Sequence, residues 1–311
     1  IGFESLKDST TSSNNTAVGR SALLSNTTGA DNTAVGYLAL SSSTTANDNT
    51  AVGKNSLASN TTGSQNTAIG DQSLANNTTA SNNTACGRNA MGSNTTGTQN
   101  VAVGTQALDE NTTGSNNVAI GFDASTLSNG GNNVAIGKAA FAASNTVNGA
   151  VAIGYEAFNR LTTGNHNLAI GYQAGDHYTS TTDTTIIGYS AATAGTTGEC
   201  NTIVGSHAFV TATTAANSTG MGHAALNAVT TGNNNTAVGR LALLVLTTGG
   251  NNTALGYGAG EQSTTGSNNL LLGYEAGTGS SPNQITTGSN AIVMGNNSIT
   301  ACHIKVDWTV T

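Results

Sequence analysis

The chain has 311 residues, and Gly (40), Asn (41) and Thr (52) together make up about 43% of them. Charged residues are only 7% and aromatic residues 4%, which is too little large apolar and charged surface for two ordinary globular domains. A single proline and no Gly-x-y period exclude collagen, and no apolar run reaches the ~20 residues of a membrane-spanning helix. The composition favours a repetitive extracellular or virion β structure.

The net charge of −7 comes from 15 acidic and 8 basic residues, and the basic residues are scattered singly. No basic patch for nucleic acid or for an anionic membrane is present, so we expect neither as a partner. The three cysteines, Cys86, Cys200 and Cys302, lie far apart in the sequence. Their spacing predicts neither a disulfide framework nor a zinc site.

A motif of the form Asn-Thr-Ala-Val-Gly recurs along the whole chain, starting with a truncated copy at Gly2. Fifteen of the seventeen intervals between the motif glycines are 17 residues, one is 16 and the last is 22. This regularity predicts a solenoid. The structural glycines after Gly2 are Gly19, Gly36, Gly53, Gly70, Gly87, Gly104, Gly121, Gly137, Gly154, Gly171, Gly188, Gly205, Gly222, Gly239, Gly256, Gly273 and Gly295.

Each repeat begins with a short extended segment before the glycine. The residue before the glycine is almost always apolar, as at Val18 and Ile69, and it shares one face of a strand with the residue two positions earlier, as at Thr16. We expect this face to be the buried one, with the intervening alanine pointing the other way. Cys86 occupies the same apolar column and is therefore expected to be a core thiol.

The rest of each repeat alternates small, bulky and polar columns. The third residue after the glycine is Ala or Ser, and the fourth is mostly Leu, Phe or Met, as at Leu23 and Phe141. A recurring Asn opens the motif, as at Asn32, and is expected to form a hydrogen-bonded ladder between coils. A Thr-Thr pair followed by Gly, as at residues 61–63, predicts a turn.

We therefore predict an all-β fold, a parallel β-solenoid or β-roll of about eighteen 17-residue coils. Recurrent Gly and Asn and the absence of a 3.6-residue apolar period argue against helices. One buried Val or Ile per coil would contribute about 1.5–3 kcal/mol, which is little for a lone chain. We expect a homotrimeric rod, with the small Ala/Ser columns allowing copies to pack side by side.

The carboxyl end departs from the repeat. Residues 1–277 form the predicted solenoid shaft, residues 278–290 carry a five-residue excess and the only proline, and residues 291–311 hold the last repeat and a terminal segment. That segment, ACHIKVDWTVT, alternates apolar and polar residues and predicts a strand with one buried face.

The motifs NTAVG and NVAIG, followed by a small residue, resemble the head repeats of trimeric autotransporter adhesins. The longer unit TAVGYLAL…NTTG…NNTAVG is more similar to bacteriophage tail-fibre and host-specificity proteins, several of which end their shaft with a segment similar to CHIKVDWTVT. In that family an endosialidase-type intramolecular chaperone follows, trimerises the fibre and cuts itself off before a serine. The resemblance implies a trimeric fibre and marks Thr311 as the expected processing end.

The sequence offers no catalytic, cofactor-binding or metal-ligating constellation, so we expect no enzyme activity and no cofactor. His166, His177, His207, His223 and His303 occupy different repeat columns and are interpreted as isolated surface residues, although a trimer axis could bring together three copies of His207 or His223 around a metal. The residue after the motif glycine is often Tyr, Arg or Lys, as at Tyr155 and Lys54. This column is either a solvated stripe whose rings cover the coil below or a surface that touches glycans.

Three functions remain open. The first is a non-enzymatic shaft of a phage tail fibre, located in the virion, whose partners are its own copies, other tail proteins and a host cell-surface receptor of glycan or protein. The second is a trimeric adhesin head on a bacterial surface. The third is an ice-binding solenoid, because a rank of threonines spaced ~4.8 Å can match a lattice.

Overall fold

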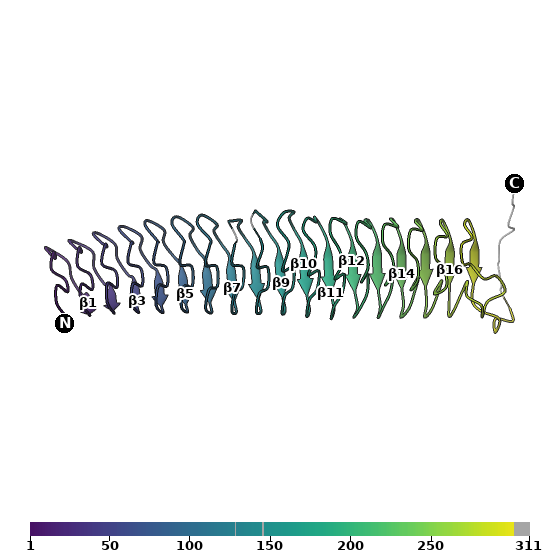
Figure 1. Cartoon of the computed structure of the whole chain (residues 1–311), viewed down its shortest axis with the longest axis horizontal. Coiled ribbons are helices and arrows are strands. Elements are labelled where there is room, and N and C mark those ends of the chain that lie inside the picture. Colours follow the sequence, from purple (N-terminus) through teal and green to yellow (C-terminus); the bar gives the residue numbers. More distant parts are fainter. Residues whose placement is uncertain (128, 145, 302–311) are drawn as a thin grey trace. The chain divides into compact units, whose positions relative to one another are not determined.

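The computed structural model describes residues 1–127, 129–144 and 146–301. Its described part is all-β and contains no helix. Two compact units divide the chain, Ile1–Thr197 and Gly198–Thr311. In each unit the chain winds into coils that place successive strands side by side, as predicted (Figure 1).

The first unit contains eleven strands of three residues each, paired in parallel. Each residue lies beside its equivalent one repeat away, as Thr16 does beside Thr33. The strands are β1 (Thr16–Val18), β2 (Thr33–Val35), β3 (Thr50–Val52), β4 (Thr67–Ile69), β5 (Thr84–Cys86), β6 (Val101–Val103), β7 (Val118–Ile120), β8 (Val134–Ile136), β9 (Val151–Ile153), β10 (Leu168–Ile170) and β11 (Thr185–Ile187).

The second unit contains six strands in the same parallel arrangement. Its last pair, β16 and β17, stays in register although 22 residues separate the two motifs, because residues 278–290 are absorbed in turns, with Ile285 buried among them. The strands are β12 (Thr202–Val204), β13 (Thr219–Met221), β14 (Thr236–Val238), β15 (Thr253–Leu255), β16 (Leu270–Leu272) and β17 (Ile292–Met294). The predicted terminal strand, with His303 and Thr311, lies outside the described residues.

The strand alternation was predicted correctly, but the assignment of its two faces was wrong. The central residue of each described strand is buried and is mostly alanine, as at Ala34, whereas the flanking residues face outward and Val18 remains 41% exposed. Beside the strand little interior space remains, because the bulky residue four positions after the motif glycine, such as Leu40 or Phe158, fills most of it. Cys86, expected as a core thiol, is accordingly a half-buried free thiol on the outer side of β5.

The small Ala/Ser column also points inward. Ala22, Ala39 and Ser56 are fully buried within their own coil, so they are not available to pack copies side by side. Small residues are required here because the backbone turns back beside the interior Leu. The expectation that this column forms the contact between copies is therefore wrong.

The segment after the glycine has an unusual alternating backbone. In the coil that follows Gly53, Asn55 (φ 56°) and Leu57 (φ 50°) are left-handed, a conformation that costs a non-glycine residue about 1–2 kcal/mol. The backbone N–H groups of these two residues point in opposite directions along the stack. The N–H of Asn55 donates to the carbonyl of Tyr37 in the preceding coil, and the N–H of Leu57 donates to the carbonyl of Ser73 in the following coil. These bonds satisfy the backbone of a stretch that is not a strand.

The predicted asparagine ladder is present. Asn66 donates from its backbone N–H and its side-chain Nδ2 to Oδ1 of Asn49, at 3.0 and 3.1 Å, and its Nδ2 also donates to the carbonyl of Ala80 at 2.9 Å. Its own Oδ1 accepts from the backbone N–H of Asn83. Each buried amide therefore satisfies the polar groups of three coils.

The motif glycine is the position of closest approach between coils. Glycines of this column have φ between about 105° and 147°, apart from Gly295 at 71°. A Cβ added to Gly239 (φ 137°) would lie 2.3 Å from the carbonyl oxygen of Gly256 in the next coil. Both the backbone conformation and the space therefore require glycine.

We predict that Gly239→Ala destabilises the second unit by about 2–6 kcal/mol, from backbone strain together with overpacking. Gly220 is the matched control, since it occupies the alanine column of β13 and an added Cβ would find its nearest neighbour, Phe209, at 3.4 Å. Gly220→Ala is expected to be neutral or stabilising. Urea unfolding followed by circular dichroism measures both; equal effects of the two substitutions would contradict the proposed role of the glycine column.

We predict that Asn66→Ala costs about 1–3 kcal/mol, because it leaves the N–H of Asn83 and the carbonyl of Ala80 buried without this partner. Asn76→Ala, at an exposed position outside the left-handed region, is the control and should change the free energy of unfolding by less than about 0.5 kcal/mol. Thermal and urea unfolding of both variants test the ladder.

Candidate functional surfaces

The outward side of the strands is a flat surface without charge. The first and third residues of β1–β11 are all half-buried or exposed, and we call this surface the strand face of the first unit. Thr16–Val18 illustrates the pattern of a threonine and a valine flanking a buried alanine, and from β6 to β10 the threonine is replaced by Val or Leu. Ile69 (42% exposed) and Val103 (38% exposed) show that the apolar rank is open to solvent in the single chain.

The column after the motif glycine forms a ladder of rings and basic groups along the turn that follows each strand. The guanidinium of Arg20 lies 5.9 Å from the ring centroids of both Phe3 and Tyr37. Lys138 lies similarly between Phe122 and Tyr155, at 6.0 and 5.6 Å. Each such contact contributes about 0.5–1 kcal/mol at an exposed site, so the column stabilises the stacking of coils.

Tyrosines of this column stack directly on each other. The rings of Tyr155 and Tyr172 are 5.1 Å apart at an interplanar angle of 10°, and those of Tyr172 and Tyr189 are 5.2 Å apart at 13°. Both faces of Tyr172 are therefore covered, and a sugar ring has no face on which to stack. The geometry favours the interpretation of this column as a stripe whose rings cover the neighbouring coil.

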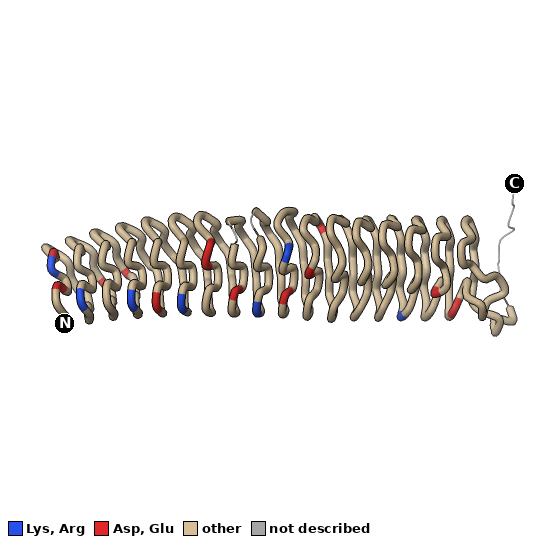
Figure 2. The backbone as a smooth tube through the Cα atoms, viewed as in Figure 1, with Lys and Arg blue, Asp and Glu red and all other residues tan. Residues whose placement is uncertain are grey.

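The corner before each strand carries a second exposed column, five residues ahead of the motif glycine. It consists mainly of Asn, Asp and Gln, and neighbours along it hydrogen-bond, as Asn14 does to Asp31 at 2.9 Å. In the first unit its charged residues are Asp31, Asp48 and Asp183, all exposed. Figure 2 shows that charged residues are few, with stretches of uncharged backbone between them.

The Thr-Thr pairs form two ranks of different character. The first threonine of each pair uses its hydroxyl within the stack, as Thr44 does by donating to the carbonyl of Thr61 at 3.2 Å. The second threonine, such as Thr62 or Thr96, is exposed at the corner. The pair therefore offers one outward rank.

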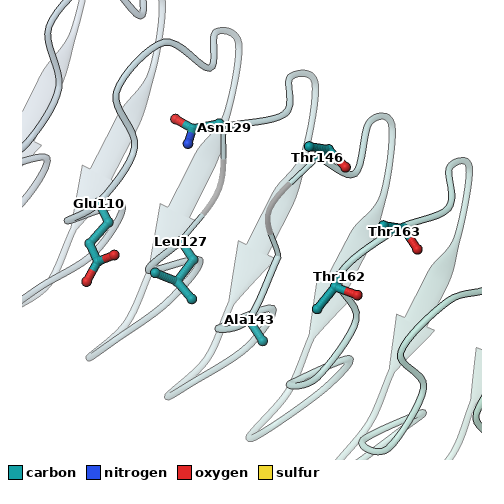
Figure 3. Close-up of a pocket in the computed structure, with 7 residues that line it drawn as sticks. All are labelled: Glu110, Leu127, Asn129, Ala143, Thr146, Thr162 and Thr163. Atoms are coloured by element: carbon teal, nitrogen blue, oxygen red, sulfur yellow. The ribbon is translucent and has the colours of Figure 1, made fainter.

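A notch interrupts the surface where one coil is a residue short. It has a volume of about 650 Å³ and is lined by Glu110, Leu127, Asn129, Ala143, Thr146, Thr162 and Thr163 (Figure 3). The shortened coil lacks a Thr-Thr pair. The side chain of Asn129 replaces it, and its Oδ1 accepts from the N–H and the hydroxyl of Thr112 at 2.8 and 2.7 Å. The notch is thus a consequence of the 16-residue interval between Gly121 and Gly137.

Asp176 is the most buried of the acidic side chains that the structure describes. Burial raises the pKa of this carboxyl above its ordinary value, while the nearby His177 and Arg160 act in the opposite direction. Its Oδ1 is buried without a hydrogen-bond partner, and its Oδ2 lies 3.8 Å from Nε2 of His177. The ionised carboxylate therefore lowers the free energy of unfolding at neutral pH.

The four histidines that the structure describes do not assemble a ligand set within the chain. His207 and His223 come from different columns, yet their rings are neighbours, with centroids 6.0 Å apart, because the second residue after one motif glycine lies beside the first residue after the next. His166 lies at an exposed corner, 3.5 Å from Asp183. Within the ranges that the structure describes, no group of three or more His, Cys, Asp or Glu could hold a metal ion.

Comparison with known proteins adds no relative: no family model matches the chain, and no curated protein does either. In the described ranges, no helix is long and apolar enough to cross a membrane. The candidate surfaces therefore rest on their own geometry.

We predict that Asp176→Asn raises the free energy of unfolding at neutral pH. The folded state holds a proton on Asp176 more strongly than the unfolded chain does, so stability increases as pH falls through the raised pKa. The advantage of the asparagine variant should accordingly shrink as pH falls from neutral towards about 4, the ordinary pKa of the carboxyl in the unfolded chain, and change little below it. Asp71→Asn, at an exposed position, controls for the loss of one charge; an equal gain from both substitutions would contradict the burial argument.

Proposed function

We propose that this chain is a non-enzymatic shaft of a bacteriophage tail fibre, assembled as a homotrimer and involved in host attachment. The observation that carries the proposal is the regular stack of three-residue strands, in which each coil contacts the next through the same glycine, asparagine and threonine columns. A stack of this kind grows in length with each added repeat and has no interior site for chemistry. The similarity of its repeats to tail-fibre and host-specificity proteins supports the virion as its location.

The main alternative is a trimeric adhesin head on a bacterial surface, which would use the same repeats. Two outward threonine ranks favour ice binding, the second threonines of the Thr-Thr pairs and the threonines of the strand face in β1–β5, each spaced about 4.8 Å apart. The rank of the pairs is interrupted at the shortened coil, which has no pair. The strand-face threonines are interrupted as well. Valine or leucine replaces them in β6–β10, so the rank is not continuous. The fibre therefore remains the first proposal.

Antibodies raised against the purified chain test the proposal. We expect them to label the tail fibres of phage particles by immunogold electron microscopy, and their monovalent fragments to block adsorption to host cells. Labelling of the bacterial surface in the absence of phage would overturn the proposal in favour of an adhesin. Thermal hysteresis of the purified chain, with no labelling of particles, would point to ice binding.

A further inference from the structure

We propose that the strand face of the first unit is the surface through which copies of this chain associate, parallel and in register, with the acidic corner column of one copy against the basic turn column of the next. The inference rests on the proposed fibre and names the contact that holds its copies together. The strand face takes the place of the small Ala/Ser columns as the expected contact between copies, because the fold buries those columns inside each coil.

The strand face has the composition of an interface core. Its twenty-two outward side chains are Thr, Val, Ile, Leu and one Cys, and none is charged. Eleven strands spaced ~4.8 Å apart and three residues wide give an area of about 500 Å², which is at the upper end of the largest apolar patches found on monomers. The six strands of the second unit follow the same pattern and present about 300 Å².

A second copy is the occupant that fits this surface along its whole length. Two copies of this chain have the same spacing between strands, so the contacts of a parallel, in-register pair recur at every coil. A globular partner has no such repeat and would contact only a few coils. Apolar ranks bordered by polar columns on both sides also follow the core-and-rim arrangement of protein interfaces.

Charge distinguishes the parallel arrangement from the antiparallel one. In the first unit, the turn column that follows the strands carries Arg20, Lys54, Arg88 and Lys138 against a single Asp71, all exposed. The corner column that precedes the strands carries only acidic charges, on Asp31, Asp48 and Asp183.

Copies that face each other in parallel bring the end of one strand beside the start of the other, and so place the turn column of one copy against the corner column of the other. In exact register Lys54 and Asp48, which belong to the same repeat, are the oppositely charged pair that meets at the same height, and the other basic turn residues face uncharged corner residues such as Asn82. A face-to-face antiparallel pair, related by a two-fold axis along the strands, would oppose each column to its own equivalent, basic to basic and acidic to acidic. Such like-charge contacts disfavour that arrangement.

The first experiment measures self-association of the full chain by analytical ultracentrifugation. Lysines introduced as Ile69→Lys and Val103→Lys should each weaken association at least about thirtyfold, because they place a charge in the centre of the contact. Both positions are exposed in the single chain, so the coil itself should fold, which circular dichroism checks. Thr62→Lys and Thr96→Lys, at exposed corners of the same coils, are the matched controls and should associate like the unaltered chain.

The second experiment tests direction and register. Lys54→Glu and Asp48→Lys should each weaken association, and the double exchange should restore it. Cys86 supplies an independent readout, because it lies on the strand face and parallel copies in register bring two of these thiols to the same height on faces that pack ~10 Å apart. In a chain carrying Cys200→Ser and Cys302→Ser, a bismaleimide cross-linker long enough to span the two faces should produce a covalent dimer that Cys86→Ser abolishes.

A monomeric full chain overturns the inference. The inference is also overturned if the Ile69→Lys and Val103→Lys variants associate as strongly as the Thr62→Lys and Thr96→Lys controls. In that case the fibre proposal stands, and its copies associate through a different surface. An associated chain from which the cross-linker produces no covalent dimer overturns the register. Self-association through this face without labelling of phage particles would instead sustain the interface and reject the fibre.

Discussion

The approach of one coil to the next at the motif glycine sets the geometry on which the rest of this structure depends. At Gly53 an added Cβ would lie 2.3 Å from the carbonyl oxygen of Gly70. This contact fixes the corner after each strand, and with it the register of the strands and the alignment of every other column. The asparagine ladder and the threonine hydroxyls then satisfy polar groups that the tight coil would otherwise leave buried without partners.

The narrow interior that results explains the division between inside and outside. Beside most strands the interior is filled by the central alanine and a bulky residue such as Leu or Phe, so the β-branched side chains that flank the alanine must face outward. A protein with ordinary core space would bury those valines and isoleucines. Here the same constraint that closes each coil leaves an uncharged apolar rank on the surface, and self-association is the physical remedy that we propose for it.

The polar columns at the two ends of each strand have separate roles. Tyrosines and basic residues after the strand cover one another, as Tyr155 and Tyr172 do, and strengthen the contact between coils. Acidic residues before the strand, such as Asp48, are exposed and differ in charge from that column. The difference gives the strand face a direction, which a structure built from near-identical repeats would otherwise lack.

The period of 17 residues and the required glycines determined the coil, the parallel register and the asparagine ladder from the sequence alone, because each depends on spacing and on residues with one conformational use. The sequence could not decide which face of Thr33–Val35 is buried, since alternation defines two faces and the volume inside the coil selects between them. The left-handed conformation of leucines such as Leu57 could not be predicted from the sequence either, because leucine has no local preference for that conformation. It is imposed by hydrogen bonds to the coils above and below, which exist only once the chain has stacked on itself.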